Sequence, residues 1–277
     1  MKNLFKLLAL LLICTTVSLA CSSDDSSSTV GTDDDSGTVT ELHNAFSEFD
    51  EDNVTVMLSG TNVVIESNGL PNHTSPYWSN TTSRTITGPE GNSMTTVSSS
   101  NHPLWVEPTV TSHDQMAPGN IDDFNGSFSL TVSANPALAS NTSSTGLGPI
   151  GIAISGSMIY NDEEGPNVPL DNAVGSLDYS AAHTGPQSYH YHLEPKAWSN
   201  DDEALIGIIA DGFFLYGRKC NETGTYPTDL DASGGHISTT QHTTEAEYHY
   251  HIQNELYLNQ YYILFPGDYQ GSASSIN

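Results

Sequence analysis

The sequence of 277 residues carries 33 Asp and Glu side chains but only 6 Lys and Arg, which gives a formal charge of −27 at pH 7. A field of this sign disfavours nucleic acids and anionic membrane surfaces as partners and favours cations. The 235 residues that follow position 42 (277 − 42) are enough for one large domain with its own core.

The chain begins with a predicted secretion signal. Two lysines precede the apolar run 7–13, which is too short to span a bilayer, and Ala20 then precedes Cys21. This order predicts a lipoprotein signal peptide over residues 1–20, with Cys21 acylated after cleavage. The membrane is then contacted through the lipid anchor only. Ordinary secretion with a free Cys21 thiol is the alternative.

Residues 21–42 consist mainly of Ser, Asp, Thr and Gly. Such a segment buries too little apolar surface to fold, so we expect a disordered acidic tether. Its Cys-Ser-Ser-Asp-Asp start resembles the acidic start of bacterial surface lipoproteins, which implies an outer-membrane lipoprotein exposed at the cell surface. A spacer that faces the periplasm is the alternative.

From residue 43 onward, short β-strand patterns separated by Gly, Pro, Asn and Ser dominate the sequence. Residues 54–58 and 62–66 flank Ser-Gly-Thr in a predicted hairpin, and apolar residues alternate with hydroxyl residues over 128–132. Further strands are expected over 84–87, 150–160, 206–210 and 261–265. Helical periodicity is scarce. Residues 43–277 are therefore predicted to form one all-β domain, a sandwich or a distorted barrel with long loops and little helix.

Three motifs occur twice in the same order, which indicates an internal duplication. The repeated segments are the apolar motifs that start at Ile150 and Ile206, the Leu-Asp-x-Ser-x-x-His motifs of 177–183 and 230–236, and the Tyr-His-Tyr-His tetrapeptides of 189–192 and 248–251. Their offsets are 56, 53 and 59 residues. Small differences in offset are what loop insertions between fixed elements produce. Residues 150–192 and 206–251 are therefore read as two repeats packed into one domain.

Each Tyr-His-Tyr-His copy directs two histidines to one face of a strand and two tyrosines to the other, because side chains alternate along a strand. The two histidines lie roughly 7 Å apart at Cα, so both imidazoles can reach one metal ion. With a histidine from a preceding loop, each half supplies three imidazoles, a set that suits Zn²⁺ or copper ions. The candidate ligands are His183, His190, His192, His236, His249 and His251. One shared site and two separate sites both fit the sequence.

A histidine that binds a metal usually donates its other N–H to a carboxylate or carbonyl. Asp178 and Asp231, at matching places in the two halves, are candidates for this supporting role, and so is Asp211, whose counterpart is Ser155. The alternative is a purely structural cluster, in which the tyrosines pack and the histidines hydrogen-bond to backbone or carboxylates.

Taken together, the motifs resemble the YHYH-domain family, which is named for the tetrapeptide. Besides both tetrapeptides, the resemblance is carried by Ser67–His73, Ala210–Gly217 and Gly234–His236. It covers roughly residues 52–271 and implies a shared domain but no reaction, because the family's biochemical role is not established. His73 is a candidate extra metal ligand. The chain departs from the family at Pro266–Asp268, where members tend to carry Gly-Cys, so no cysteine role transfers there.

Two other classes of function stay open. A three-histidine Zn²⁺ with an open position activates water, so a metal-dependent enzyme is one of them. The sequence contains no Gly-x-Ser-x-Gly, His-Glu-x-x-His or phosphate-binding glycine loop. The other is a surface module that binds glycans or an envelope protein, since four aromatic residues in predicted loops can stack on sugar rings. These are Tyr77, Trp78, Trp105 and Trp198.

Five further residues stand outside the repeated motifs. His43, His102, His113 and His242 are isolated, and loop histidines are usually just solvated. Cys220 is a candidate soft metal ligand or reactive thiol, although a lone loop cysteine is more often neither.

Overall fold

The computed structural model describes residues 39–73, 86–87, 93–94, 125–172, 177–178, 180–185, 187–194, 201–259 and 261–277. The predicted signal peptide, most of the predicted tether and the lipidation site Cys21 lie outside these residues. So do the loop aromatics proposed to stack on sugars. Within the described part, no helix has the length and apolar character needed to cross a bilayer.

The described residues fold almost entirely as short β-strands. These are β1 (Val54–Ser59), β2 (Asn62–Ser67), β3 (Ile86–Thr87), β4 (Ser93–Met94), β5 (Phe128–Ser133), β6 (Leu138–Ser143), β7 (Gly151–Ala153), β8 (Met158–Ile159), β9 (Glu163–Gly165), β10 (Val168–Pro169), β11 (Ala182–Gly185), β12 (Ser188–Tyr191), β13 (Leu205–Ile209), β14 (Phe214–Tyr216), β15 (Gly235–Ser238), β16 (Glu247–His251) and β17 (Tyr269–Gly271). Two short 3-10 helices, η1 (Asn44–Glu48) and η3 (Leu170–Asn172), are the helical elements of this part. The predicted all-β class is confirmed.

Two sheets pack around one main core. The predicted hairpin of β1 and β2 turns at Gly60, whose φ is +64°, and β5 pairs with β2 to complete a three-stranded sheet. Apolar side chains of this sheet, such as Ile65 and Leu130, belong to the same buried cluster as Ile152 and Ile208 of a larger sheet. The arrangement is sandwich-like, and the described strands close no barrel.

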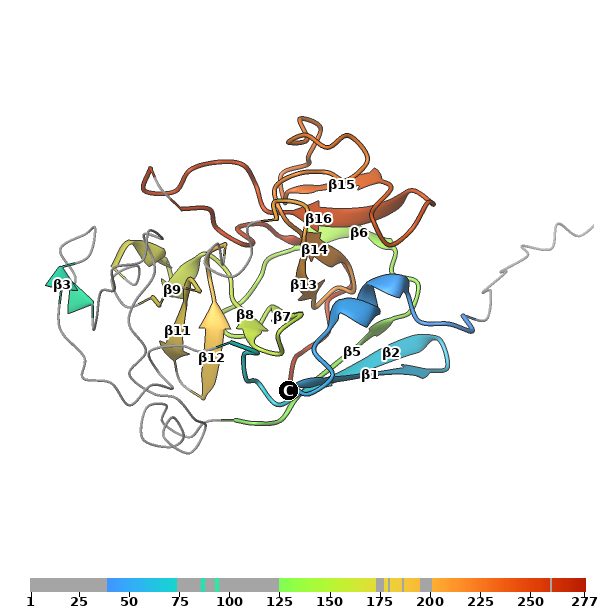
Figure 1. Ribbon diagram of the computed structural model, residues 1–277, viewed down its shortest axis with the longest axis horizontal. Coiled ribbons are helices and arrows are strands. Elements are labelled where there is room, and N and C mark those ends of the chain that lie inside the picture. The colour runs from blue at the N-terminus through green and yellow to red at the C-terminus, as the bar shows by residue number, and fades with distance from the viewer. Residues whose placement is uncertain are drawn as a thin grey trace, which may run out of the picture. The chain divides into compact units, whose positions relative to one another are not determined.

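The larger sheet has eight strands in the order β11-β12-β8-β7-β13-β14-β16-β15. From the centre outward, each half repeats one pattern: an antiparallel pair (β7–β8 or β13–β14), a parallel pair (β8–β12 or β14–β16) and an outer antiparallel pair (β12–β11 or β16–β15). Figure 1 shows β11 and β12 well away from β15 and β16, with the four central strands between them. The duplication read from the sequence is therefore visible as two matching half-sheets.

The two half-sheets meet at β7 and β13 with local two-fold symmetry. Ile152 pairs directly with Ile208, its counterpart at the 56-residue offset. When the two repeats are exchanged, the residue pair on one side of this central pair becomes the pair on the other side. Glycine is needed at this junction because the strands approach closely. A Cβ atom on Gly207 would lie 2.3 Å from the carbonyl oxygen of Ile152, and one on Gly151 would lie 2.6 Å from that of Ile208.

Two strand predictions need correction. The apolar run 150–160 is not one strand but the tight hairpin of β7 and β8, which turns at Gly156 with φ +105°. The segment 261–265 is not a named strand either, because its backbone pairs with separate partners one residue at a time. Ile263 forms an isolated bridge with Leu193, and Tyr261 forms another with Tyr257.

Candidate metal centres in the two half-sheets

The first histidine cluster lies at the end of one half-sheet. His183 on β11 stands directly opposite His190 on β12, and His192 follows β12 on the same face. The ring centroids are 4.6 Å apart for His183 and His190, 4.8 Å for His190 and His192, and 5.3 Å for His183 and His192. One nitrogen from each ring lies within 4.8 Å of the other two, and all three residues are buried. The three histidines predicted for this half therefore converge.

Neighbouring groups fix how these rings are turned. The Nδ1–H of His192 donates to the carbonyl oxygen of Asn161 at 2.6 Å, which leaves the Nε2 lone pair of a neutral ring directed elsewhere. The ring of Tyr160 stacks on His190 at 3.7 Å. Burial, followed by the neighbouring histidines, holds the pKa of His190 well below its usual value and lowers that of His192 to about 4. Both rings are therefore neutral at pH 7 and able to act as ligands.

Glu164 on β9 faces this cluster. One of its carboxylate oxygens lies 3.3 Å from Nε2 of His183 and 3.3 Å from Nε2 of His192. Burial acts to raise the Glu164 pKa, but the hydrogen bond and charge of His183 and the charge of His192 outweigh it, so the pKa is lowered. An ionised oxygen and the His192 lone pair thus face each other, an arrangement that a bound cation would stabilise. A pocket of about 500 Å³, lined in part by Glu164 and the three histidines, gives access from outside.

The second cluster repeats this geometry in the other half-sheet. His236 on β15 stands opposite His249 on β16, and His251 lies two residues farther on the same face. The ring centroids are 4.9 to 5.1 Å apart. All three residues are buried. The three rings of the second predicted triad therefore also gather, although the ligand atoms that lie within 4.8 Å of one another are those of His236 and His251 together with Cys220.

Two ring nitrogens of the second cluster lie directly opposite each other. The Nδ1–H groups of His249 and His251 donate to the carbonyl oxygens of Glu247 at 3.0 Å and Gly217 at 2.6 Å. Their Nε2 atoms lie 3.1 Å apart. In neutral rings of this tautomer both Nε2 atoms carry lone pairs, which repel unless a proton or metal cation lies between them. Burial, as the largest cause, lowers the pKa values to about 3 and about 4, so a proton is disfavoured at pH 7.

Cys220, predicted only as a candidate soft ligand or reactive thiol without a partner, lies at the second cluster. Its Sγ atom lies within 4.8 Å of ligand nitrogens of His236 and His251. The Ser238 hydroxyl bridges the two sides of the cluster, 3.3 Å from Sγ and 3.1 Å from Nε2 of His236. A sequence signal existed, because Cys220 follows Glu164 by 56 residues, the offset that relates Ile150 to Ile206.

The predicted supporting aspartates lie on the tyrosine side of the strands. Asp178 accepts a hydrogen bond from Tyr189, Asp231 accepts one from Tyr248 at 2.7 Å, and Asp211 accepts one from Tyr250 at 2.6 Å. The reason is the strand alternation itself, because these turn residues pack beneath the face that carries the tyrosines. Supporting contacts to the histidines come mainly from backbone carbonyls, and Asp229 supplies a carboxylate 3.1 Å from Nδ1 of His236.

His73, predicted as an extra ligand, also lies on the tyrosine side. Its Nε2 atom is 2.8 Å from the Tyr191 hydroxyl, and its Nδ1 atom is 3.2 Å from the Ser180 hydroxyl. Since Tyr191 and the flanking histidines point to opposite faces of β12, His73 belongs to the polar network beneath the sheet. It is not part of the first histidine cluster.

The two described histidine clusters are separated in space, so they are two candidate sites and not one shared site. Strands β8, β7, β13 and β14 lie between β12 and β16. Five strand-to-strand steps of about 4.8 Å place the clusters roughly 24 Å apart across the sheet. No single ion can bind ligands from both.

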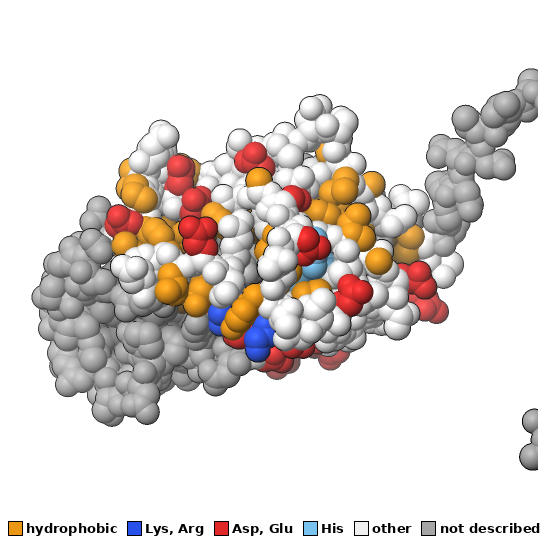
Figure 2. All heavy atoms as spheres, turned by 90° about the horizontal axis from the view of Figure 1, so that it is seen from above, with side chains coloured by type: hydrophobic (Ala, Val, Ile, Leu, Met, Phe, Trp, Pro, Cys, Tyr) orange, Lys and Arg blue, Asp and Glu red, His pale blue; other side chains and the backbone are white. Residues whose placement is uncertain are grey.

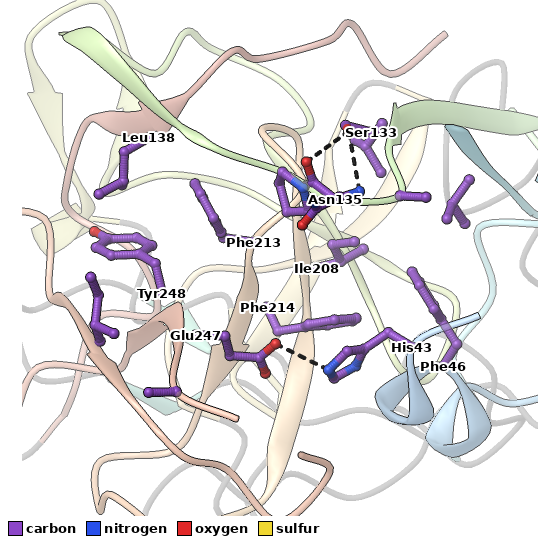
Figure 3. A pocket seen from close by; sticks show the side chains of 17 residues that line it. His43, Phe46, Ser133, Asn135, Leu138, Ile208, Phe213, Phe214, Glu247 and Tyr248 are labelled. Carbon is purple, nitrogen blue, oxygen red and sulfur yellow. Dashed lines mark hydrogen bonds and ion pairs between the residues drawn. The ribbon is translucent and has the colours of Figure 1, made fainter. Parts of the chain in front are cut away.

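Two histidines expected to be solvated instead make specific contacts. His242 lies 2.6 Å from Glu48 and 2.9 Å from the Tyr216 hydroxyl. His43 lies 3.1 Å from Glu247 at the edge of a separate pocket of about 360 Å³ (Figure 3). Phe213, Phe214 and Tyr248 are among the aromatic residues that line this pocket. Its lining contains none of the six histidines of the clusters.

Acidic side chains are spread over the surface seen in Figure 2, whereas Lys and Arg are confined to one small area of that face. This distribution agrees with the formal charge of −27. The resulting negative potential raises the local concentration of cations around the protein.

Comparison with known proteins places part of this sheet in a family. Residues 129–228 match the YHYH protein family. The match includes the first tetrapeptide and ends before the second, so it is shorter than the span suggested by the motifs. Searches of curated proteins and of solved structures found no match. Residues 129–228 therefore belong to the YHYH protein family, as the sequence motifs predicted.

Proposed function

We propose that the chain binds two transition-metal ions of the zinc and copper class, one at each histidine cluster. The observation that carries this proposal is the 3.1 Å separation of two Nε2 atoms whose rings already donate through Nδ1. Two imidazole nitrogens on one tetrahedral Zn²⁺ are about 3.3 Å apart, given Zn–N bonds of about 2.0 Å. The apposition thus has nearly the spacing that a shared metal ion requires.

The first cluster supports the proposal independently. Its three rings meet on one face, and an ionised carboxylate lies 3.3 Å from two of their nitrogens. A purely structural cluster would pair each bare nitrogen with a donor. Here Nε2 of His192 is buried and has no hydrogen-bond donor among the described residues. A cation satisfies this nitrogen and the carboxylate at once.

The proposed setting is the bacterial outer membrane, with Cys21 as the lipid-anchored N-terminus and the domain exposed at the cell surface. The acidic surface fits a protein that collects cations from its surroundings. A glycan or an envelope protein is the proposed alternative partner. This chain would recognise such a partner through aromatic residues that lie outside the described part of the chain.

The test is the metal content of untagged protein, measured by elemental analysis after exposure to Zn²⁺ or Cu²⁺ and gel filtration. The unmodified chain should retain two ions per molecule. Replacing His190 and His192 with Ala should remove one ion, and replacing His249 and His251 should remove the other. His43→Ala, which changes a histidine outside both clusters, should retain two. Unchanged metal content in both double variants would refute the proposal.

A further inference from the structure

We infer that the two sites select different ions: the second binds Cu⁺ through the Cys220 thiolate, and the first binds Zn²⁺ through the Glu164 carboxylate. This inference rests on the proposed function, since it assigns an ion to each proposed site. It goes beyond the duplicated histidines, because it depends on a position at which the described parts of the two clusters carry different donor groups, a carboxylate in one and a thiol in the other.

Glu164 and Cys220 occupy equivalent positions in the two repeats. Each lies four residues beyond an equivalent tyrosine, Tyr160 or Tyr216, at the end of β8 or β14. The backbone carbonyls of Asn161 and Gly217 accept the hydrogen bond that orients the last histidine of each cluster. Each of the two donors lies three residues beyond the corresponding one of these carbonyls. The 56-residue offset is the same in all three pairs. The duplication thus kept the histidines and changed the fourth donor.

The contacts show that both side chains face their clusters. The Glu164 oxygen is 3.3 Å from nitrogens of His183 and His192. Cys220 Sγ is grouped within 4.8 Å with the equivalent His236 and His251. Cys220 is only 1% exposed, so its sulfur is directed inward and is not available as a surface thiol.

Donor chemistry then separates the ions. A thiolate is a soft ligand that favours Cu⁺ and also binds Zn²⁺, whereas a carboxylate is a hard oxygen ligand that suits Zn²⁺ and disfavours Cu⁺. The remaining ligands are imidazoles in both clusters, so they do not discriminate between the sites. In a reducing mixture of both ions, Cu⁺ is therefore expected at the second site and Zn²⁺ at the first.

Co²⁺ is a suitable probe because a bound thiolate gives a near-ultraviolet charge-transfer band that nitrogen and oxygen ligands do not give, while visible absorption reports Co²⁺ at either site. The unmodified protein, kept reduced, should bind two Co²⁺ and show one thiolate band. Cys220→Ser should lose the band and keep the visible absorption of the first site. Glu164→Cys should add a second thiolate band, and Glu164→Gln should leave the original band unchanged.

The outcomes separate this inference from the proposal beneath it. Two bound Co²⁺ ions without a thiolate band, or a band that persists in Cys220→Ser, would overturn the inference and leave the metal sites standing. Absence of binding of Co²⁺, Zn²⁺ and Cu⁺ alike would overturn both. Competition with equal Cu⁺ and Zn²⁺ under anaerobic reducing conditions should give one ion of each per chain, and Cys220→Ser should lose the copper. Two copper ions, or two zinc ions, in the unmodified protein would also overturn the inference.

Discussion

Nε2 of His249 lies 3.1 Å from Nε2 of His251, although the other nitrogen of each ring is directed at a backbone carbonyl. Backbone carbonyls fix the tautomers, and burial disfavours a proton between the rings. The cost of this apposition without a metal is the basis of the predictions on metal content and on the pH dependence of stability. The close approach of the two nitrogens follows from how the folded chain orients the two rings, since the tetrapeptide sequence alone does not determine where its nitrogens point.

Stability of the metal-free protein should fall with acidity. The folded-state pKa values of His192, His249 and His251, about 4, about 3 and about 4, lie below the ordinary value of 6.5. The unfolded chain therefore takes up more protons as the pH falls below about 6.5. These histidines contribute stability that is present above this pH and is lost progressively as the pH falls toward about 3, the lowest of these folded-state values. Urea denaturation in excess chelator at pH 7.5 and at pH 5 should show the lower free energy of unfolding at pH 5.

The acidic side chains of the protein also titrate in this range, so a variant is needed as a control. A protein with His249→Gln and His251→Gln should show a shallower loss of stability between pH 7.5 and 5, since glutamine does not titrate. An equally steep loss in this variant would contradict the assignment to the histidines.

The tyrosine side should be separable from the metal sites. Tyr250→Phe removes the hydroxyl that donates to the buried carboxylate of Asp211 at 2.6 Å. We expect a loss of about 1–3 kcal/mol in the free energy of unfolding, because a buried acceptor loses a partner. Metal content should remain at two ions per chain, since Tyr250 points away from His249 and His251. Loss of one ion together with retained folding would show that the two faces are coupled.

The junction of the two half-sheets should not tolerate a side chain at its centre. Gly207→Ala places a Cβ atom 2.3 Å from the Ile152 carbonyl oxygen, so the β7–β13 pairing must open. A loss of at least about 1–3 kcal/mol is expected, as for other overpacked positions. Gly165→Ala is the matched control, because its Cβ would meet Val168 at 3.6 Å, an ordinary contact. Equal thermal stability of the two variants would contradict the proposed close approach.

The sequence predicted the faces of the tetrapeptides because strand alternation is a local rule. It also predicted the duplication, since the repeated motifs lie on paired strands. The supporting role assigned to Asp178, Asp211 and Asp231 differs from their observed contacts with tyrosines, because spacing does not specify on which face of a sheet a turn residue packs. The sequence marked Cys220 as a candidate soft metal ligand, but its place beside His236 and His251 is a tertiary contact to which only the 56-residue offset from Glu164 pointed.

The segment 261–265 illustrates a different limit of prediction. Its apolar residues suggested a strand, and Leu264 and Phe265 are indeed fully buried. The Leu264 amide donates to the carbonyl of His192, and the Tyr262 carbonyl accepts from the amide of Glu194. These bonds connect the segment to the chain just beyond β12. Apolar character thus predicted burial, whereas the length of strand pairing depended on tertiary partners.

The central claim is that each half-sheet holds one metal ion. Native mass spectrometry of untagged, reduced protein during titration with Zn²⁺ measures this directly. We predict saturation at two ions per chain, at one ion in the His190→Ala, His192→Ala variant, and at none when His249→Ala and His251→Ala are added. A folded, unmodified chain that saturates at one Zn²⁺ ion, or that takes up none, would contradict the claim.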